Sequence, residues 1–255
     1  MKIQVLGSSG SVAPGQNTAA FLLDRKFLLD AGTISLSLRR ASQLKITHIF
    51  ITHAHLDHLK GLPFFLDNIL MSRHQRTFTV LSGPEVIRDI RRHLFNNRIW
   101  PDFSVLPTPS APLIRYQSVP LKGFLKIDGY RIYAARVNHT VPAYGYMIED
   151  PLGDAVIYTG DTGPTEKIWR LMAGHRVGGL IIEVSFPNSQ EELARVTRHL
   201  TPRLLAGEIQ KMPFLPKRIW ITHLKFHYRK IIEKEISRMP WGPAKILSDG
   251  MRLLV

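Results

Sequence analysis

Cysteine is absent from this 255-residue chain. Its absence excludes a disulfide framework, a cysteine-ligated zinc finger, an iron–sulfur cluster and a thiol nucleophile. Long apolar runs are also missing, since none approaches the roughly 18 residues of a membrane-spanning helix. The opening segment, MKIQVLGSSG, has no apolar stretch of signal-peptide length. We therefore expect a cytoplasmic protein without membrane contact, in which histidine and carboxylate side chains hold any metal.

Acidic residues are scarce, with 20 Asp and Glu against 34 Lys and Arg, so the formal net charge is +14. A chain this basic attracts phosphates, but basic residues spread over a solvated surface equally serve solubility. Between Arg73 and Arg98, six arginines face only Glu85 and Asp89, a local net charge of +4. Both a solvated helix face and a phosphate-binding surface fit this segment.

Short apolar runs bounded by Gly, Pro, Asn or Asp predict strands along the whole chain. They are KIQVLG, AAFLLD, KFLLDAG, HIFITH, TFTVLSG, YRIYAARV, AYGYMIED, AVIYTGD, GLIIEV, RIWITH and AKILSDG. Several are apolar throughout, as in strands covered on both faces, and helix-length patterns lie between them, which predicts an α/β or α+β class. Helices are predicted over residues 63–72, 84–95, 165–173, 189–199, 201–212 and 228–237.

Local signals mark two of the helix starts and one boundary. Ser189 with Glu192 forms a capping-box pattern, and Thr201 is an expected N-cap because Pro202 follows it. Residues 101–120 hold five prolines. We interpret this stretch as an exposed seam between two β-rich halves of a single domain over residues 1–255, since neither half contains all the chemistry described below. Residues 7–11, GSSGS, predict a tight turn or a backbone cradle for phosphate.

Three of the eleven histidines fall in one hexapeptide, His53-Ala-His55-Leu-Asp57-His58, directly after a strand-like run. Imidazoles two residues apart at a strand end point the same way, and the following Asp and His can face them. One loop can therefore supply ligands to two adjacent metal ions.

Two adjacent ions need roughly seven to eight protein ligands with one carboxylate shared between them. His139, Asp161 and His223 each follow a strand-like run and could complete such a set. We interpret the other histidines as non-ligands; these are His48, His74, His93, His175 and His227. His227 lies four residues after His223 and would face the same way on a helix.

The hexapeptide and the later lone His, Asp and His resemble the metallo-β-lactamase superfamily over essentially the whole chain. The resemblance implies a four-layer αβ/βα sandwich, in which two mixed β-sheets carry helices on their outer faces and the metals lie between the sheet edges. It also implies that His53, His55 and His139 hold one metal, that Asp57, His58 and His223 hold the other, and that Asp161 bridges both. Zinc is the first expectation, although manganese or iron suits the same ligands. A homodimer is common in this superfamily.

Further segments resemble the class II cyclic-nucleotide phosphodiesterases and, in layout, the tRNA 3′-processing nuclease RNase Z. They are IIEVSFPN at 181–188 followed by HLTP at 199–202, VLGSSGSVAPGQNTAAFLL with KFLLDAG, and THAHLDHLKGLPFFLDN. The resemblance implies a dinuclear metal-dependent phosphodiesterase that converts 3′,5′-cAMP or cGMP to the 5′-nucleotide. In it, Asp57 would orient the attacking water, and His199, supported by Glu183, would protonate the leaving oxygen. In the structural alternative, Glu183 closes a strand and His199 caps a helix.

Two other functions are considered: a metallo-ribonuclease acting on RNA, and a non-catalytic nucleic-acid-binding metalloprotein. The RNase Z pattern carries a long arm between its third metal-binding His and its bridging Asp, whereas only 22 positions separate His139 from Asp161 here. The last histidine motif reads THLKF, where the phosphodiesterase-like pattern often reads THLKP. The substrate preference is therefore the least determined feature of the sequence.

Overall fold

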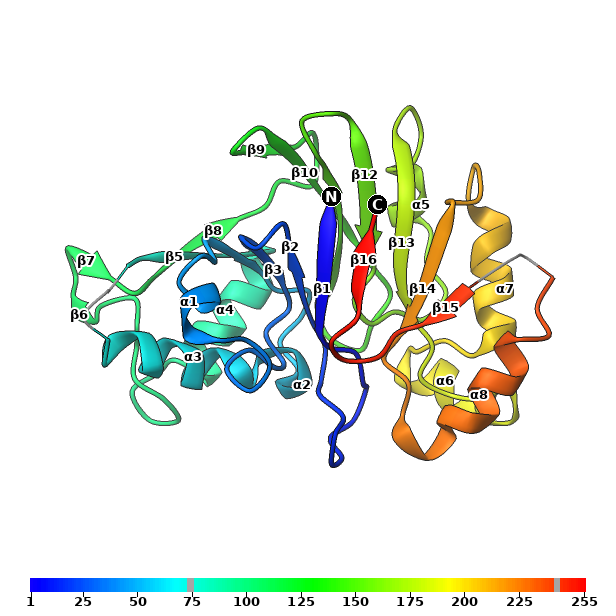
Figure 1. Cartoon of the computed structure of the whole chain (residues 1–255), viewed down its shortest axis with the longest axis horizontal. Coiled ribbons are helices and arrows are strands. Elements are labelled where there is room, and N and C mark those ends of the chain that lie inside the picture. The colour runs from blue at the N-terminus through cyan, green and yellow to red at the C-terminus, as the bar shows by residue number, and fades with distance from the viewer. Residues whose placement is uncertain (73–75, 241–243) are drawn as a thin grey trace.

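The computed structural model describes residues 1–72, 76–240 and 244–255, which form two seven-stranded sheets (Figure 1). The first sheet has the order β16-β1-β2-β3-β4-β5-β8 and the second has the order β15-β14-β13-β12-β11-β10-β9. The strands of the first are Arg252–Leu254, Lys2–Gly7, Ala20–Leu23, Phe27–Leu29, His48–Phe50, Phe78–Ser82 and Ile114–Ser118. Those of the second are Ala244–Ile246, Arg218–Thr222, Arg176–Glu183, Asp154–Tyr158, Tyr144–Glu149, Tyr130–Arg136 and Leu125–Ile127. Both sheets are mixed, as the resemblance to the metallo-β-lactamase superfamily implied.

Helices cover the outer faces of the two sheets, on opposite sides of the molecule (Figure 1). On one side lie α1 Arg40–Gln43, α2 Leu56–Leu59, α3 Gly61–Leu70 and α4 Pro84–His93. On the other lie α5 Lys167–Arg170, α6 Glu191–Thr197, α7 Pro202–Lys211 and α8 Arg229–Ile236. The remaining elements are β6 Pro107–Thr108, β7 Ala111–Pro112 and the 3-10 turns η1 Asn188–Gln190 and η2 Phe226–Tyr228. No helix in the described ranges is long and apolar enough to span a bilayer.

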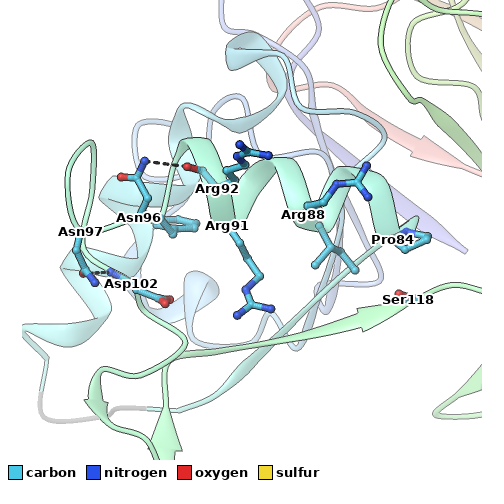
Figure 2. Close-up of a pocket in the computed structure, with 10 residues that line it drawn as sticks. Pro84, Arg88, Arg91, Arg92, Asn96, Asn97, Asp102 and Ser118 are labelled. Carbon is cyan, nitrogen blue, oxygen red and sulfur yellow. Dashed lines mark hydrogen bonds between the residues drawn. The ribbon is translucent and has the colours of Figure 1, made fainter.

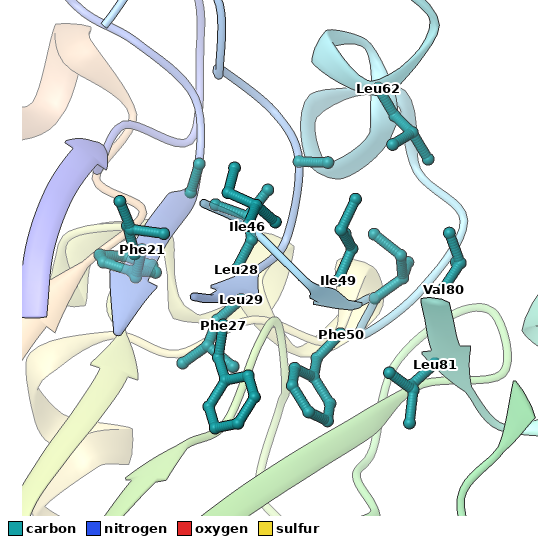
Figure 3. Packing of buried hydrophobic residues seen from close by; sticks show 14 of the residues in the cluster. Phe21, Phe27, Leu28, Leu29, Ile46, Ile49, Phe50, Leu62, Val80 and Leu81 are labelled. Carbon is teal, nitrogen blue, oxygen red and sulfur yellow. The ribbon is translucent and has the colours of Figure 1, made fainter. Parts of the chain in front are cut away.

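The two sheets face each other across a shared aromatic core. Phe21 of β2 packs edge-on against Tyr158 of β12, with ring centroids 5.1 Å apart, and Phe50 of β4 packs against Tyr146 of β11 at 5.6 Å. Strands β2 and β3 are buried on both faces, which explains their continuous apolar runs (Figure 3). Burial of these large side chains against one another holds the inner faces of the two sheets together.

Every strand-like run of the sequence forms a strand, but several boundary predictions were wrong. Residues 101–120 do lie between β5 of the first sheet and β9 of the second, but they are not loop throughout, because Ile114–Ser118 forms β8 and pairs in parallel with β5 at the edge of the first sheet. The predicted helix at 165–173 shrinks to α5. The capping box does not form, since α6 begins after Gln190, with Ser189 inside η1 and no side-chain cap. Thr201 does cap α7, accepting a hydrogen bond from the Leu204 amide. Arg73 and His74 lie outside the described residues.

One edge of the sandwich collects the ends of several strands and the loops that follow them. Strands β3 and β4 run parallel in one sheet, and β12, β13 and β14 run parallel in the other, so the carboxyl ends of each set meet. The polar residues that follow these ends lie where the two sheets face each other, and they form the site described next.

Candidate metal centre

Three histidines form the first group of converging side chains. The Nδ1 of His55 lies 3.1 Å from the Nε2 of His53 and 3.2 Å from the Nε2 of His139. His53 and His139 are buried, whereas His55 is partly exposed. Three ring nitrogens that face one another across such distances form a pocket for a cation rather than a hydrogen-bonded cluster.

The second group contains Asp57, His58, His223 and Asp161, whose donor atoms lie within 4.8 Å of one another. The Nε2 of His223 lies 3.1 Å from the Oδ2 of Asp57 and 3.4 Å from the Nε2 of His58. Short helix α2 carries Asp57 and His58 on the turn that follows the first two histidines. One loop therefore contributes to both groups, as the hexapeptide pattern predicted.

Asp161 stands between the two groups. Its Oδ2 lies 3.2 Å from the Nε2 of His223, 3.3 Å from that of His58 and 3.7 Å from that of His53. The carboxylate is 2% exposed and follows the end of β12. This is the position that a carboxylate shared by two cations would occupy.

The protonation preferences of these side chains suit metal binding. Burial lowers the pKa of His53 well below its ordinary value, and burial also lowers the pKa of His55 and of His139. Burial opposes ionisation of Asp161, but His223 and His58 beside it hold its pKa well below the usual range. Neutral imidazoles and ionised carboxylates are the forms that ligate metal, so the pKa directions of these three histidines and of Asp161 suit metal binding. Burial opposes the charged form of His58, but the carboxylates of Asp161 and Asp30 raise its pKa well above the ordinary value, so a metal ion bound there would displace a proton.

Sequence reasoning missed Asp30, which follows β3 and is fully buried. The carboxylate accepts hydrogen bonds from the Thr52 amide at 2.7 Å, the Tyr158 hydroxyl at 2.7 Å and the His58 Nδ1 at 2.7 Å. Because Asp30 takes the Nδ1 proton of His58, Nε2 is the nitrogen that faces Asp161 and could ligate a metal ion. The available signal was an aspartate directly after the apolar run KFLL.

His223 adopts a left-handed backbone conformation, with φ of 65°. Its amide donates to the Ser8 carbonyl at 2.7 Å, and a Cβ at Gly10 would come within 2.6 Å of the His223 ring. Within the GSSGS turn, the amides of Ser8, Ser9 and Gly10 all donate to protein acceptors. The turn therefore holds His223 in place and offers those amides to no phosphate.

Glu183 and His199 form a buried pair beside the two groups. The Nδ1 of His199 donates to Glu183 at 2.6 Å, and the ring stacks on His223 at a centroid distance of 5.5 Å. Glu183 also accepts from the Thr162 amide and from the Ser185 hydroxyl, which sequence reasoning did not single out. Burial opposes the charged form of His199, but the Glu183 carboxylate raises its pKa overall.

The remaining described histidines lie outside the converging groups. His227, the closest candidate by spacing, is exposed in η2 and packs against Phe226. His48 contacts Thr47, and His175 contacts Glu149. Five residues of the predicted set form two further groups that overlap at His199: donor atoms of His139, Asp161 and His199 lie within 4.8 Å of one another, as do those of Glu183, His199 and His223.

Comparisons with known proteins agree with this geometry. A family model described as the beta-lactamase superfamily domain matches residues 25–224. A protein of Yersinia pestis described as a probable 3′,5′-cyclic-nucleotide phosphodiesterase is 27% identical over 266 residues, covering 90% of this chain and 74% of its own length. A ribonuclease Z of Methanothermobacter thermautotrophicus is 25% identical and covers 100% of this chain and 97% of its own.

Two solved structures show the same architecture. Yeast PDE1 superposes with a TM-score of 0.83 at 19% identity, covering 100% of this chain and 99% of its own. The short form of human tRNase Z gives a TM-score of 0.72 at 20% identity, with the same coverage. The fold and the family match together show that this chain belongs to the beta-lactamase superfamily and is a hydrolase of the metallo-β-lactamase fold.

Proposed function

We propose that this hydrolase cleaves a 3′,5′-cyclic nucleotide to the 5′-nucleotide with the help of two divalent ions, zinc first among them. The observation that carries the proposal is the arrangement of seven nitrogen and carboxylate donors in two adjacent groups that share Asp161. The buried pair of His199 and Glu183 at their side adds the proton donor that a phosphodiester needs and a purely structural metal site does not.

In this proposal His53, His55 and His139 hold one ion, Asp57, His58 and His223 hold the other, and Asp161 contacts both. Bound divalent ions supply an activated water at neutral pH and neutralise the charge that develops on phosphoryl oxygens. Asp57 is 29% exposed at the mouth of the site, unlike the buried His58, so its carboxylate can also accept a proton from the attacking water and orient it.

His199 is proposed to protonate the departing 3′ oxygen. Glu183 takes the Nδ1 proton, which leaves Nε2 as the nitrogen that can face substrate. Because Glu183 raises the pKa of His199, the imidazolium persists closer to neutral pH than a buried histidine alone would allow. Ser185 links the pair to the metal site, since its hydroxyl donates to Glu183 and lies 2.9 Å from the Nδ1 of His223.

A metallo-ribonuclease is the second candidate, favoured by full-length relatives described as ribonuclease Z. In this chain His139 and Asp161 are joined by β11, β12 and a tight turn at Asp150–Gly153, where the Gly153 amide donates to the Asp150 carbonyl. That connection leaves no room for the long arm of the RNase Z pattern. We therefore place RNA processing second.

The test is product analysis after incubation with 3′,5′-cyclic AMP and added zinc or manganese. We expect release of 5′-AMP, abolished by a chelator and by Asp57→Ala but not by Asp67→Ala, an exposed aspartate on α3. Release of 3′-AMP would contradict the role of His199. No turnover of the cyclic nucleotide, together with cleavage of a structured RNA, would favour the ribonuclease.

A further inference from the structure

Helix α4 presents three arginines to one groove of about 590 Å³ between the helix and the loops that precede β8 (Figure 2). Arg88, Arg91 and Arg92 lie three and four residues apart, so they share a face of the helix. Ile87 and Phe95 supply apolar lining, and Pro84 and Ser118 stand at one end. The basic segment of the sequence therefore places three cations in one concave surface.

Within the described residues, none of these three guanidinium groups takes part in an ion pair. All three side chains are exposed. Arg76, which belongs to the same basic segment but precedes α4, has protein contacts instead: it donates to the Leu44 carbonyl and lies over the Phe78 ring. Like charges on adjacent turns repel each other, and a bound anion would relieve that repulsion.

Tyr116 of β8 contacts the central arginine of this face from below. Its ring lies under the Arg91 guanidinium, 5.8 Å from ring centroid to guanidinium carbon. Tyr116 is not one of the residues that line the groove, so its ring supports the Arg91 guanidinium from the side of the sheet.

The far end of the groove limits how far an anion can extend. Asp102 lies there, and its carboxylate accepts from the amide and the hydroxyl of Ser104. The side chains of Asn96 and Asn97 are used in local hydrogen bonds that shape this end. The cationic stretch is therefore the α4 face itself, which rises about 6 Å from Arg88 to Arg92.

The opposite end approaches the metal centre through a chain of contacts. Glu85, next to Pro84, accepts from the Tyr144 hydroxyl at 2.6 Å and pairs with Arg136. The Tyr144 amide in turn donates to the carbonyl of Thr52, the neighbour of His53. The groove is thus outside the metal centre but connected to its supporting strands.

We propose that this α4 groove binds the phosphodiester backbone of single-stranded nucleic acid. Three exposed guanidiniums, none paired with a carboxylate within the described residues, complement the charges of successive phosphates, and this charge complementarity carries the proposal. The proposal goes beyond cyclic-nucleotide hydrolysis and does not depend on it, since no residue of the groove belongs to the metal centre.

The experiment measures fluorescence anisotropy of labelled single-stranded RNA and DNA of about ten nucleotides, titrated with the metal-loaded protein between about 50 and 200 mM salt. We expect the combined substitution Arg88→Ala, Arg91→Ala and Arg92→Ala to weaken binding at least about tenfold and to reduce the salt slope by roughly two. Hydrolysis of cyclic AMP should not change, which separates this proposal from the function of the metal centre.

A matched control removes the same charge from another helix surface. Lys230, Lys234 and Arg238 are exposed on and just after α8, and their combined replacement by alanine should change affinity less than about threefold. Single Arg91→Glu provides a second groove variant if the triple variant folds poorly. Equal losses in both triple variants would overturn the proposal, as would the absence of oligonucleotide binding. Tighter capture of polyglutamate than of oligonucleotide would assign the groove to an acidic polypeptide and would also overturn it.

Discussion

Substitution of Asp30 by asparagine should weaken one metal position and spare the other. The Oδ2 of Asp30 meets the His58 Nδ1 and the Tyr158 hydroxyl, both at 2.7 Å, while its Oδ1 meets the Thr52 amide at 2.7 Å. An asparagine that keeps its oxygen on the Thr52 amide turns its NH2 group toward His58. The imidazole must then accept at Nδ1 and carry its proton on Nε2, the nitrogen that faces Asp161.

A proton on the Nε2 of His58 occupies the lone pair that would bind the metal, and this sets the size of the loss in metal affinity. Loss of the partner that orients a ligating histidine typically lowers metal affinity about 10- to 100-fold, or about 1.4–2.8 kcal/mol. We expect the backbone conformation at position 30 to stay unchanged, because Asp30 has a φ of 55° and asparagine tolerates this left-handed conformation well. The His53 group keeps its support, because Thr52 Oγ1 lies 3.0 Å from the His53 Nδ1 and can still donate to the asparagine oxygen.

The assay is competition for zinc with a chromophoric chelator, which resolves two dissociation constants. Asp30→Asn should raise one of them about 10- to 100-fold and leave the other within a few-fold. Thr52→Val is the matched variant, since it removes the hydroxyl beside His53 and should weaken the opposite position. Two unchanged constants in Asp30→Asn would refute the orienting role of Asp30.

Three further predictions concern the proton donor and the fold. His199→Gln should lower kcat for cyclic AMP about 10²- to 10⁴-fold with metal content unchanged. The loss of kcat should be much smaller for an ester with a p-nitrophenolate leaving group, because that group needs no proton. Equal losses on the two substrates would contradict an acid role. Glu183→Gln removes the charge that raises the pKa of His199, so burial then lowers that pKa and the alkaline limb of the kcat–pH profile should move to lower pH; an unmoved limb would oppose the pairing. Chelation of metal held at about 100 times its Kd should cost about 2.7 kcal/mol of unfolding free energy, visible as a lower Tm in wild type but a smaller change in Asp161→Ala.

The sequence predicted the interior of the fold better than its edges. Strands missed at the sequence level include β8, β9 and β16, and each of them stands at the end of a sheet. Their sequences, IRYQS, LKI and RLL, mix charged or exposed residues with few buried ones, because an edge strand has a neighbour on one side only. Interior strands such as β2 and β13 are almost wholly buried, so they can be predicted from their apolar runs. Strand β8 also lies within the proline-rich stretch 101–120, which is typical of a loop, and it has few buried residues because it is an edge strand.

The candidate ligands could be predicted because each one lies within a few residues of a strand end or in the hexapeptide that leads into α2, where a local pattern is readable. Residues that act through another side chain carry no such pattern. Asp30 contacts His58 across 28 positions, Ser185 contacts His223 across 38, and Ser8 holds the His223 backbone from 215 positions away. Their partners are set by the packing of two sheets, and nothing local in the chain specifies that distance. In a site of this kind, short sequence motifs predict which residues are ligands. The tautomer and orientation of each ligand depend on long-range contacts that only the folded chain supplies.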